Sequence, residues 1–255
     1  MSLLDFKNVT LRFGGLKCVN DLTFRMGENE LVGLIGPNGA GKTTVFNLVT
    51  GVYRPTAGAI RFQGRSVAGH RPYRITGRGI ARTFQNIRLF GSLSVFDNVR
   101  TACNMHLRHG ISHALFRGRG FRAEEEEIEK TVMDLLDVFG LAGLRDRPGN
   151  SLPYGDQRRL EIVRALATRP KLLLLDEPAA GMNSAEKERL MQLIRFTKEK
   201  FRLAILLVEH DMKVVMGICE RIIVLDYGGK IAEGLPGEIR NDPRVIAAYL
   251  GKEAA

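Results

Sequence analysis

Residues 30–44 read ELVGLIGPNGAGKTT, and this stretch decides the fold. The apolar run Leu31–Ile35 predicts a buried strand, and the run Thr43–Thr50 predicts a helix that ends before a glycine. Between them, Gly36–Thr43 match the pattern G-x-x-x-x-G-K-[ST] in full. Glycines at these places let backbone N–H groups point at an anion, and the helix N-terminus adds the positive end of its dipole. The sequence therefore predicts a phosphate-binding loop between a strand and a helix.

The pattern also predicts the roles of two side chains within this loop. Lys42 is expected to reach the β- and γ-phosphates of a nucleoside triphosphate, and the Thr43 hydroxyl is expected to bind Mg²⁺. The alternative is an ordinary glycine-rich turn that holds no ligand. The strand before the loop and the helix after it favour the phosphate-binding interpretation.

Length and composition set wide bounds on the class of protein. The chain has 255 residues, of which 44% are hydrophobic and 26% charged, as in a globular protein of one large or two modest domains. No apolar run approaches the roughly 20 residues of a membrane span. The first ten residues lack a charged leader followed by an apolar segment, so no secretory signal is expected. The three cysteines are scattered without a C-x-x-C pair, which favours a reducing cytosol over a disulfide or zinc framework.

The net charge of +10 is unevenly placed. From Leu31 to Phe96 there is no aspartate or glutamate, whereas this window holds nine basic residues: Lys42, Arg54, Arg61, Arg65, Arg71, Arg74, Arg78, Arg82 and Arg88. Such a field favours a polyphosphate ligand and an anionic membrane surface nearby. A nucleic-acid partner is not expected, because aromatic residues do not alternate with the basic ones and no nucleic-acid motif is present.

The remaining patterns predict an α/β fold with a mostly parallel sheet. Residues 3–13 are expected to form an edge strand and Val19–Met26 a second strand, which together suggest an N-terminal antiparallel β layer. Further strands are expected at Ala59–Phe62, within Gly77–Gln85, and at Lys171–Asp176, Leu203–Val208 and Arg221–Leu225, the last followed by a hairpin partner. Helices are expected to begin near Asn183 and Ser184, after Asp211 and at Pro243.

A helical subdomain is expected within this α/β domain. Helical spacing starts at Ser94 and is strong over Glu124–Gly140, while Arg108–Arg122 read as a loop or short insertion. Another helix is expected from Leu152–Gln157 to Thr168. We therefore expect a single domain over 1–255, with residues 1–87 and 158–255 as the catalytic α/β lobe and residues 88–157 as the helical subdomain.

Polar residues at the ends of predicted strands are the candidates for chemistry. Asp176 follows four leucines and suits Mg²⁺, and the adjacent Glu177 can polarise a water for attack on a phosphorus atom. The alternative is a pair of acids at the start of a helix. His210 ends another buried strand and can donate to a γ-phosphate oxygen, although alone it is equally well a structural histidine. Gln85 is a weaker candidate for metal and water, and Phe13 either stacks on an adenine or packs in its strand.

The ordered set Gly36–Thr43, Gln85, Leu152–Gln157, Asp176-Glu177 and His210 resembles the Walker A, Q-loop, signature, Walker B and H-loop of an ABC transporter ATPase. The resemblance covers nearly the whole chain and implies a RecA-like P-loop NTPase fold with ATP and Mg²⁺ as cofactors. It implies that ATP lies between two such domains, arranged head to tail.

The same resemblance implies a role for each motif residue. Glu177 would be the general base, His210 the switch on the γ-phosphate, and Gln85 the sensor of the metal. Metal ligands would be Thr43, Gln85 and Asp176. The cofactor-binding residues would be Phe13 on the adenine and, around the phosphates, Gly36, Pro37, Asn38, Gly39, Ala40, Gly41, Lys42, Thr43 and Thr44. Contacts to ATP held by the partner would come from Tyr154, Gly155, Asp156 and Gln157.

Two departures from the general family pattern narrow the resemblance. Pro153 stands where the signature L-S-G-G-Q has its serine, and Asn183 stands where an aspartate is common. The runs Ala81–Val99, Leu152–Leu166 and Asp176–Asn183 look like the larger ATPase subunit of branched-chain amino acid importers, and an insertion over 101–123 fits that subunit. This resemblance implies uptake of leucine, isoleucine and valine at the cytoplasmic face of the inner membrane. Its partners would be a second ATPase subunit (the same or different), membrane permeases and, indirectly, a substrate-binding protein.

Three alternatives compete with this interpretation. The homodimeric ATPase of lipopolysaccharide export shares part of the pattern, although Pro153 argues against it. A soluble ABC protein acting on ribosomes or DNA usually has two ATPase domains or long coiled coils, and this chain has neither pattern. A small-molecule kinase or GTPase would leave Leu152–Gln157 and His210 unexplained, and the N-K-x-D motif is absent.

Overall fold

The computed structural model describes residues 2–106 and 119–250. The chain divides into two units, one made of residues 1–85 and 171–255 and the other of residues 86–170.

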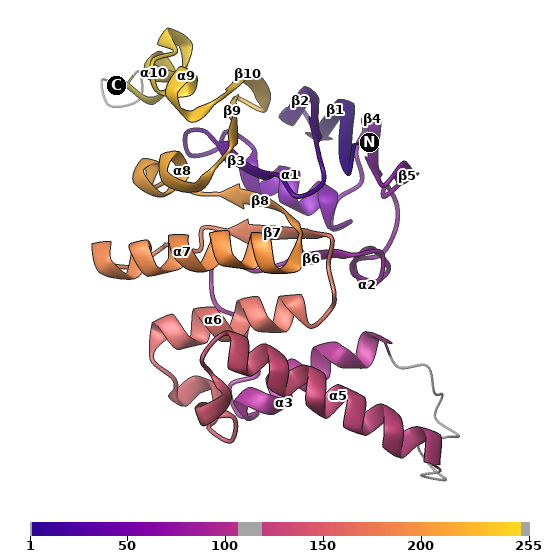
Figure 1. Ribbon diagram of the computed structural model, residues 1–255. Helices are drawn as coiled ribbons and strands as arrows, with labels where there is room; N and C mark the ends of the chain where they lie inside the picture. Colours follow the sequence, from indigo (N-terminus) through magenta and orange to yellow (C-terminus); the bar gives the residue numbers. More distant parts are fainter. Residues whose placement is uncertain (1, 107–118, 251–255) are drawn as a thin grey trace. The chain divides into compact units, whose positions relative to one another are not determined.

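The first unit contains a six-stranded sheet in the order β10-β9-β3-β8-β7-β6 (Figure 1). All its neighbours pair in parallel except β10, which is antiparallel to β9. The strands are β3 (Leu31–Ile35), β6 (Ile80–Arg82), β7 (Leu172–Asp176), β8 (Ala204–Val208), β9 (Arg221–Asp226) and β10 (Gly229–Gly234). Every residue of β3, β7 and β8 is buried, as expected for apolar runs covered on both faces of a sheet. The prediction of a mostly parallel sheet is confirmed.

An antiparallel sheet in the order β2-β1-β4-β5 forms the N-terminal layer of the same unit. Its strands are β1 (Leu4–Phe13), β2 (Leu16–Met26), β4 (Ala57–Phe62) and β5 (Arg65–Ser66). The prediction of an edge strand at residues 3–13 was wrong, because β4 pairs with the free side of β1 and aligns Leu4 with Phe62. A local pattern could not reveal this partner some 50 positions further along the chain.

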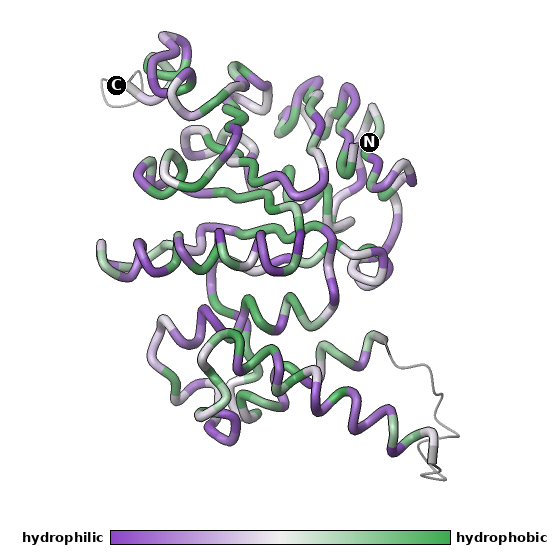
Figure 2. Tube along the Cα trace, in the orientation of Figure 1, coloured by the Kyte–Doolittle hydropathy of each residue, from purple (hydrophilic) through white to green (hydrophobic). Residues whose placement is uncertain are grey.

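One hydrophobic cluster joins the two sheets through α1 (Lys42–Val49). It contains Phe6 and Phe24, whose stacked rings lie 4.5 Å apart, together with Phe46 of α1 and Leu174 of β7. Figure 2 shows hydrophobic residues along the central strands, whereas hydrophilic and hydrophobic residues alternate along the longer helices. The helix that follows the phosphate-binding loop is therefore anchored by core packing.

The other helices of this unit are α2 (Pro72–Thr76), α7 (Ser184–Phe201), α8 (Met212–Ile218), α9 (Pro236–Arg240) and α10 (Pro243–Leu250). Of the two caps predicted for α7, the structure selects Asn183, whose side chain accepts N–H groups of Ala185 and Glu186. The Glu186 carboxylate accepts the N–H of Asn183 in return, which completes a capping box.

The second unit is helical. Its described residues form the helices α3 (Val95–Cys103), α5 (Arg119–Val138) and α6 (Tyr154–Leu166) and the short 3₁₀ turns η1 (Asn104–His106), η2 (Ala142–Leu144) and η3 (Gly149–Ser151). Residues 119–122 are helical, where a loop was predicted, and the rest of that predicted loop, residues 108–118, lies outside the described residues. The boundary predicted after Gln157 also needs correction. The helix α6 continues unbroken through it and packs against α3, so residues 158–170 belong to this unit.

Within residues 2–106 and 119–250, no helix combines the length and the apolar character needed to cross a membrane.

Candidate nucleotide-binding and hydrolysis site

Two glycines of the loop between β3 and α1 lie where any side chain would meet neighbouring backbone. Gly36 has a φ of +151°, and a Cβ atom there would lie 2.1 Å from the carbonyl oxygen of Leu225 in β9. Gly41 is the N-cap of α1 with a φ of +102°, and a Cβ atom there would lie 2.5 Å from the carbonyl oxygen of Cys18. Both glycines therefore allow the loop to pass close to neighbouring backbone.

Lys42 lies inside this loop, with only 6% of its surface exposed. Its Nζ donates to the carbonyl oxygens of Gly36 and Pro37, at 2.7 and 2.9 Å. The loop thus holds a positive charge at the N-terminus of a helix, where the helix dipole also favours an anion. Asn38, Gly39 and Thr43 are exposed on the same turn. This arrangement fits a phosphate group.

The three predicted catalytic residues meet at the Glu177 carboxylate. Oε1 of Glu177 lies 2.7 Å from Nε2 of His210, and Oε2 accepts a hydrogen bond of 2.7 Å from the Gln85 amide. Glu177 directly follows β7, Gln85 follows β6 and His210 follows β8, and these strands are adjacent and parallel. The shared carboxyl-end edge of the sheet brings the three residues together. Glu177 also has a φ of +46°, a left-handed conformation that side chains other than glycine rarely adopt.

Asp176 is the last residue of β7, and its carboxylate is bound by a residue that the sequence analysis did not select. Nη2 of Arg82 donates to Oδ2 of Asp176 at 2.7 Å, and the two side chains are only 9% and 6% exposed. Only the position of Arg82, three residues before Gln85, could have indicated this contact.

Glu209 is a second residue that the sequence analysis missed. It is 3% exposed, and its carboxylate accepts the N–H groups of Ala179 at 2.6 Å and His210 at 3.0 Å. Burial raises the pKa of Glu209, while the backbone hydrogen bonds lower it and the charge of Glu177 raises it further. The residue joins the loop after Glu177 to the loop that carries His210. An acid at the end of the apolar run Ala204–Val208 was the available signal.

Phe13 lies at the end of β1 with 48% of its surface exposed, and its ring meets the edge of Tyr53 at a centroid distance of 5.1 Å. An exposed aromatic ring held by a second ring can stack on a base. The adenine contact of Phe13 stays a prediction, to which the structure adds Tyr53 as a neighbour.

The predicted Mg²⁺ ligands Thr43, Gln85 and Asp176 offer hydroxyl, amide and carboxylate oxygens, the donors that Mg²⁺ prefers. In the described part of the chain, no group of three or more histidine, cysteine, aspartate or glutamate residues could hold a metal ion. The hydroxyl, amide and carboxylate oxygens of Thr43, Gln85 and Asp176 fit Mg²⁺, which usually keeps several water and phosphate ligands.

The residues predicted to contact ATP in a partner begin α6 in the helical unit. The Gln157 amide donates to the Leu152 carbonyl oxygen at 2.8 Å, and Asp156 forms an ion pair with Arg159. Tyr154 is exposed, and Pro153 caps the helix without a side-chain hydrogen bond. The contacts of these four residues with a nucleotide stay predictions.

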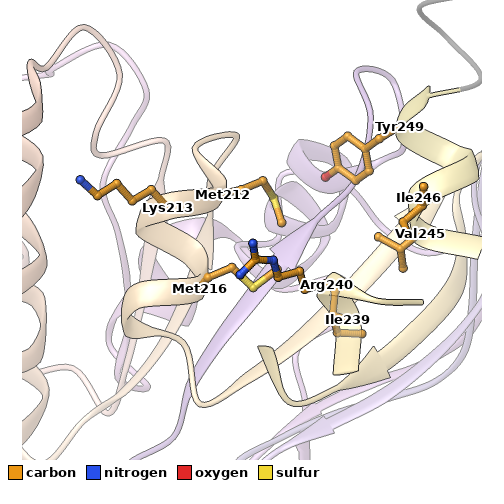
Figure 3. Close-up of a pocket in the computed structure, with 8 residues that line it drawn as sticks. All are labelled: Met212, Lys213, Met216, Ile239, Arg240, Val245, Ile246 and Tyr249. Atoms are coloured by element: carbon orange, nitrogen blue, oxygen red, sulfur yellow. The ribbon is translucent and has the colours of Figure 1, made fainter. Parts of the chain in front are cut away.

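A separate cavity of about 590 Å³ lies among α8, α9 and α10 (Figure 3). Its lining is mainly apolar, with two basic residues, and comprises Met212, Lys213, Met216, Ile239, Arg240, Val245, Ile246 and Tyr249. Burial raises the pKa of Tyr249, and the adjacent backbone of Gly36 lowers it. The C-terminal helix therefore contacts the first glycine of the phosphate-binding loop, a link that no local sequence pattern predicted.

Known proteins resemble this chain over its whole length. The family model described as "ABC transporter" matches residues 19–180, and "Branched-chain amino acid ATP-binding cassette transporter" matches residues 230–255. The high-affinity branched-chain amino acid transport ATP-binding protein LivG of Salmonella typhimurium is 45% identical over 98% of both chains. The lipopolysaccharide export system ATP-binding protein LptB of Escherichia coli is 34% identical over 99% of both.

Solved structures of ABC transporter ATP-binding cassettes are also similar to this chain. The ADP conformation of MJ1267, an ATP-binding cassette of an ABC transporter, matches with a TM-score of 0.84 at 28% identity, over 98% of this chain and 99% of that one. A dimeric post-hydrolysis state of the cassette MJ0796, bound to ADP and phosphate, matches with a TM-score of 0.74 at 26% identity, over 91% and 98%. The similarities extend over almost the full length of the chain, and they agree with the complete phosphate-binding loop and with the sheet edge where Glu177, Gln85 and His210 meet. The chain therefore belongs to the ATP-binding subunits of ABC transporters and is an ATPase of that family.

Proposed function

We propose that this ATPase powers the uptake of branched-chain amino acids (leucine, isoleucine and valine) through separate membrane permeases. The observation that carries the proposal is the full-length similarity to LivG, together with the family-specific match over residues 230–255. In this role the protein works at the cytoplasmic face of the cell membrane, supplied indirectly by a substrate-binding protein.

The proposed chemistry follows from the geometry around Glu177. Lys42 exchanges the carbonyl oxygens of Gly36 and Pro37 for phosphate oxygens when ATP binds. Glu177 then accepts a proton from the attacking water, and His210 donates to an oxygen of the γ-phosphate. Thr43, Asp176 and Gln85 would hold Mg²⁺, which neutralises charge on the phosphates when it is bound.

Gln85 has a further part in this cycle. Its amide and His210 both contact Glu177 in the structure, so the carboxylate is engaged on both oxygens. Opening of either contact would give the attacking water an additional free lone pair on the Glu177 carboxylate. Gln85 is the last residue before the helical unit, and its displacement would couple hydrolysis to the permease.

The proposal includes a second ATPase subunit, either identical or different, because the motif set implies a shared site. The dimeric relative with bound ADP and phosphate supports this arrangement. Tyr154, Gly155, Asp156 and Gln157 would then face ATP held by the partner, using the N-terminus of α6. Pro153 removes the signature hydroxyl from this side, which favours a different partner with a standard signature.

Lipopolysaccharide export is the second candidate function, supported by the 34% identity to LptB over the full length. That identity is lower than for LivG, and the departure at Pro153 would appear in both sites of a self-dimer. Branched-chain amino acid uptake is therefore the better supported proposal.

Reconstitution in liposomes tests the proposal. The chain, candidate permeases and a substrate-binding protein are combined, and ATP hydrolysis is measured with single solutes added. We expect leucine, isoleucine or valine to stimulate hydrolysis, and complexes carrying Glu177→Gln to show no stimulation. Stimulation by another solute alone would contradict the substrate assignment.

A further inference from the structure

Arg82 forms a buried network beside the predicted metal site. One guanidinium nitrogen donates to Oδ2 of Asp176 and another to Oδ1 of Asn47, both at 2.7 Å. The guanidinium carbon lies 5.4 Å from the ring centroid of Phe46 and 5.2 Å from that of Phe84. Two hydrogen bonds and two aromatic rings thus fix this side chain.

The ion pair between Arg82 and Asp176 is buried. Both side chains are less than 10% exposed, so an unpaired Asp176 carboxylate would be strongly unfavourable in the absence of a cation. Arg82 supplies the opposite charge at one carboxylate oxygen. The other oxygen can then be offered to a cation without rotation of the carboxylate.

The network also joins the elements that would hold Mg²⁺. Asn47 and Phe46 belong to α1, whose first turn carries Thr43, and Asp176 ends β7. Arg82 itself ends β6, three residues before Gln85. The three predicted metal ligands therefore stand on segments that meet at one guanidinium group.

We propose that Arg82 is a positioning residue for the metal site, which holds the Asp176 carboxylate in the orientation that binds Mg²⁺ with the nucleotide. The inference rests on the proposed Mg²⁺ role of Asp176. Lysine cannot replace arginine here, because a single ammonium group cannot bond Asn47 and Asp176 in a fixed fork or stack between two rings.

The test uses the full chain and separates metal binding from hydrolysis. ADP affinity is measured by isothermal titration calorimetry, once in EDTA and once in Mg²⁺, and the ratio of the two dissociation constants gives the gain due to the metal. Arg82→Lys is the main variant. Asn47→Ala, which keeps the ion pair but removes one anchor, is the second and milder variant. Arg78→Lys is the control, because Arg78 bonds Ser66 and His70 in the same unit.

We expect Arg82→Lys to lower the metal-dependent gain by about tenfold, the usual cost of losing a residue that orients a metal ligand, with ADP affinity in EDTA unchanged. Asn47→Ala should show a smaller loss of the same kind, and Arg78→Lys should match the wild type. If Arg82→Lys does not fold, the Mg²⁺-dependent increase in ADP affinity of Asn47→Ala still tests the inference.

Three results would contradict the inference. In the first, Arg82→Lys and Asn47→Ala both retain the wild-type increase in ADP affinity on addition of Mg²⁺. In the second, both variants lose ADP affinity equally in EDTA and in Mg²⁺, which would indicate a general defect of the nucleotide site. A wild-type protein that gains nothing from Mg²⁺ would refute the proposed metal site itself, and the inference with it.

Discussion

The environment of Lys42 fits a phosphate ligand. An ammonium group is buried against two backbone carbonyl oxygens, a contact that phosphate oxygens can replace with stronger charge-assisted bonds. Lys42→Ala should therefore weaken ATP binding by about tenfold or more, since a hydrogen bond to a charged group contributes about 1.5–3 kcal/mol. Equilibrium binding of a fluorescent ATP analogue measures the change, and the exposed Lys17→Ala is the control. Unchanged affinity of Lys42→Ala would contradict the phosphate-binding role of the loop.

Glu209 should make stability depend on pH. Its pKa is raised above 4.5 in the folded protein, chiefly by burial, so the folded state keeps this proton at a pH where the unfolded state has lost it. The contribution of Glu209 to the free energy of unfolding is then fully present below pH 4.5 and declines as the pH rises through the folded pKa.

The variant Glu209→Gln cannot titrate and should lose this decline. Melting temperatures of both proteins are compared from pH 4 to pH 7. We expect the melting temperature of the variant to rise relative to that of the wild type as the pH rises. A constant difference between the two curves would show that Glu209 has no raised pKa.

At the scale of elements, the apolar runs and the glycine pattern were enough to predict the strand, loop and helix of residues 31–50. The central strands β7 and β8 followed from continuous leucine, isoleucine and valine runs, which only a doubly covered strand can bury. Because Glu177 and His210 both follow buried strands, their positions also indicated that they lie at one edge of the sheet.

The errors in sheet order and in the boundary of the helical unit have one physical cause, which is contact between distant segments. Pairing with β4 moved β1 away from the edge of its sheet, and packing against α3 placed all of α6 in the helical unit. Arg82, Glu209 and Tyr249 were missed for the same reason, because their importance comes from partners 30 to more than 200 residues away. Local periodicity contains no information about such partners.

The loop after β3 gives a matched pair of glycine substitutions. Gly36→Ala would place a methyl group 2.1 Å from the backbone of β9, whereas Gly39→Ala meets nothing within 4 Å at a φ of +82°. Urea unfolding should show a loss of more than about 3 kcal/mol for Gly36→Ala, and about 1–2 kcal/mol of backbone strain for Gly39→Ala. Equal losses would mean that the close approach of Gly36 to β9 does not restrict this position.

At the scale of the whole molecule, we propose that the chain carries two separate halves of a nucleotide site. The α/β unit holds the phosphate-binding loop and Glu177, and the helical unit holds the N-terminus of α6. If the second half acts on a partner's ATP, the wild-type subunit alone should hydrolyse ATP slowly, and its cycle should depend on the subunit that completes the site.

The measurement that tests this account most directly is ATP turnover and ATP retention by Glu177→Gln, assayed with the partner subunits present. The amide keeps the size of the side chain but cannot accept a proton from water. We predict normal ATP binding, bound ATP that stays unhydrolysed, and turnover reduced by about 100-fold or more, the usual contribution of a general base. Turnover near the wild-type rate would remove Glu177 from its role and contradict the account of the site.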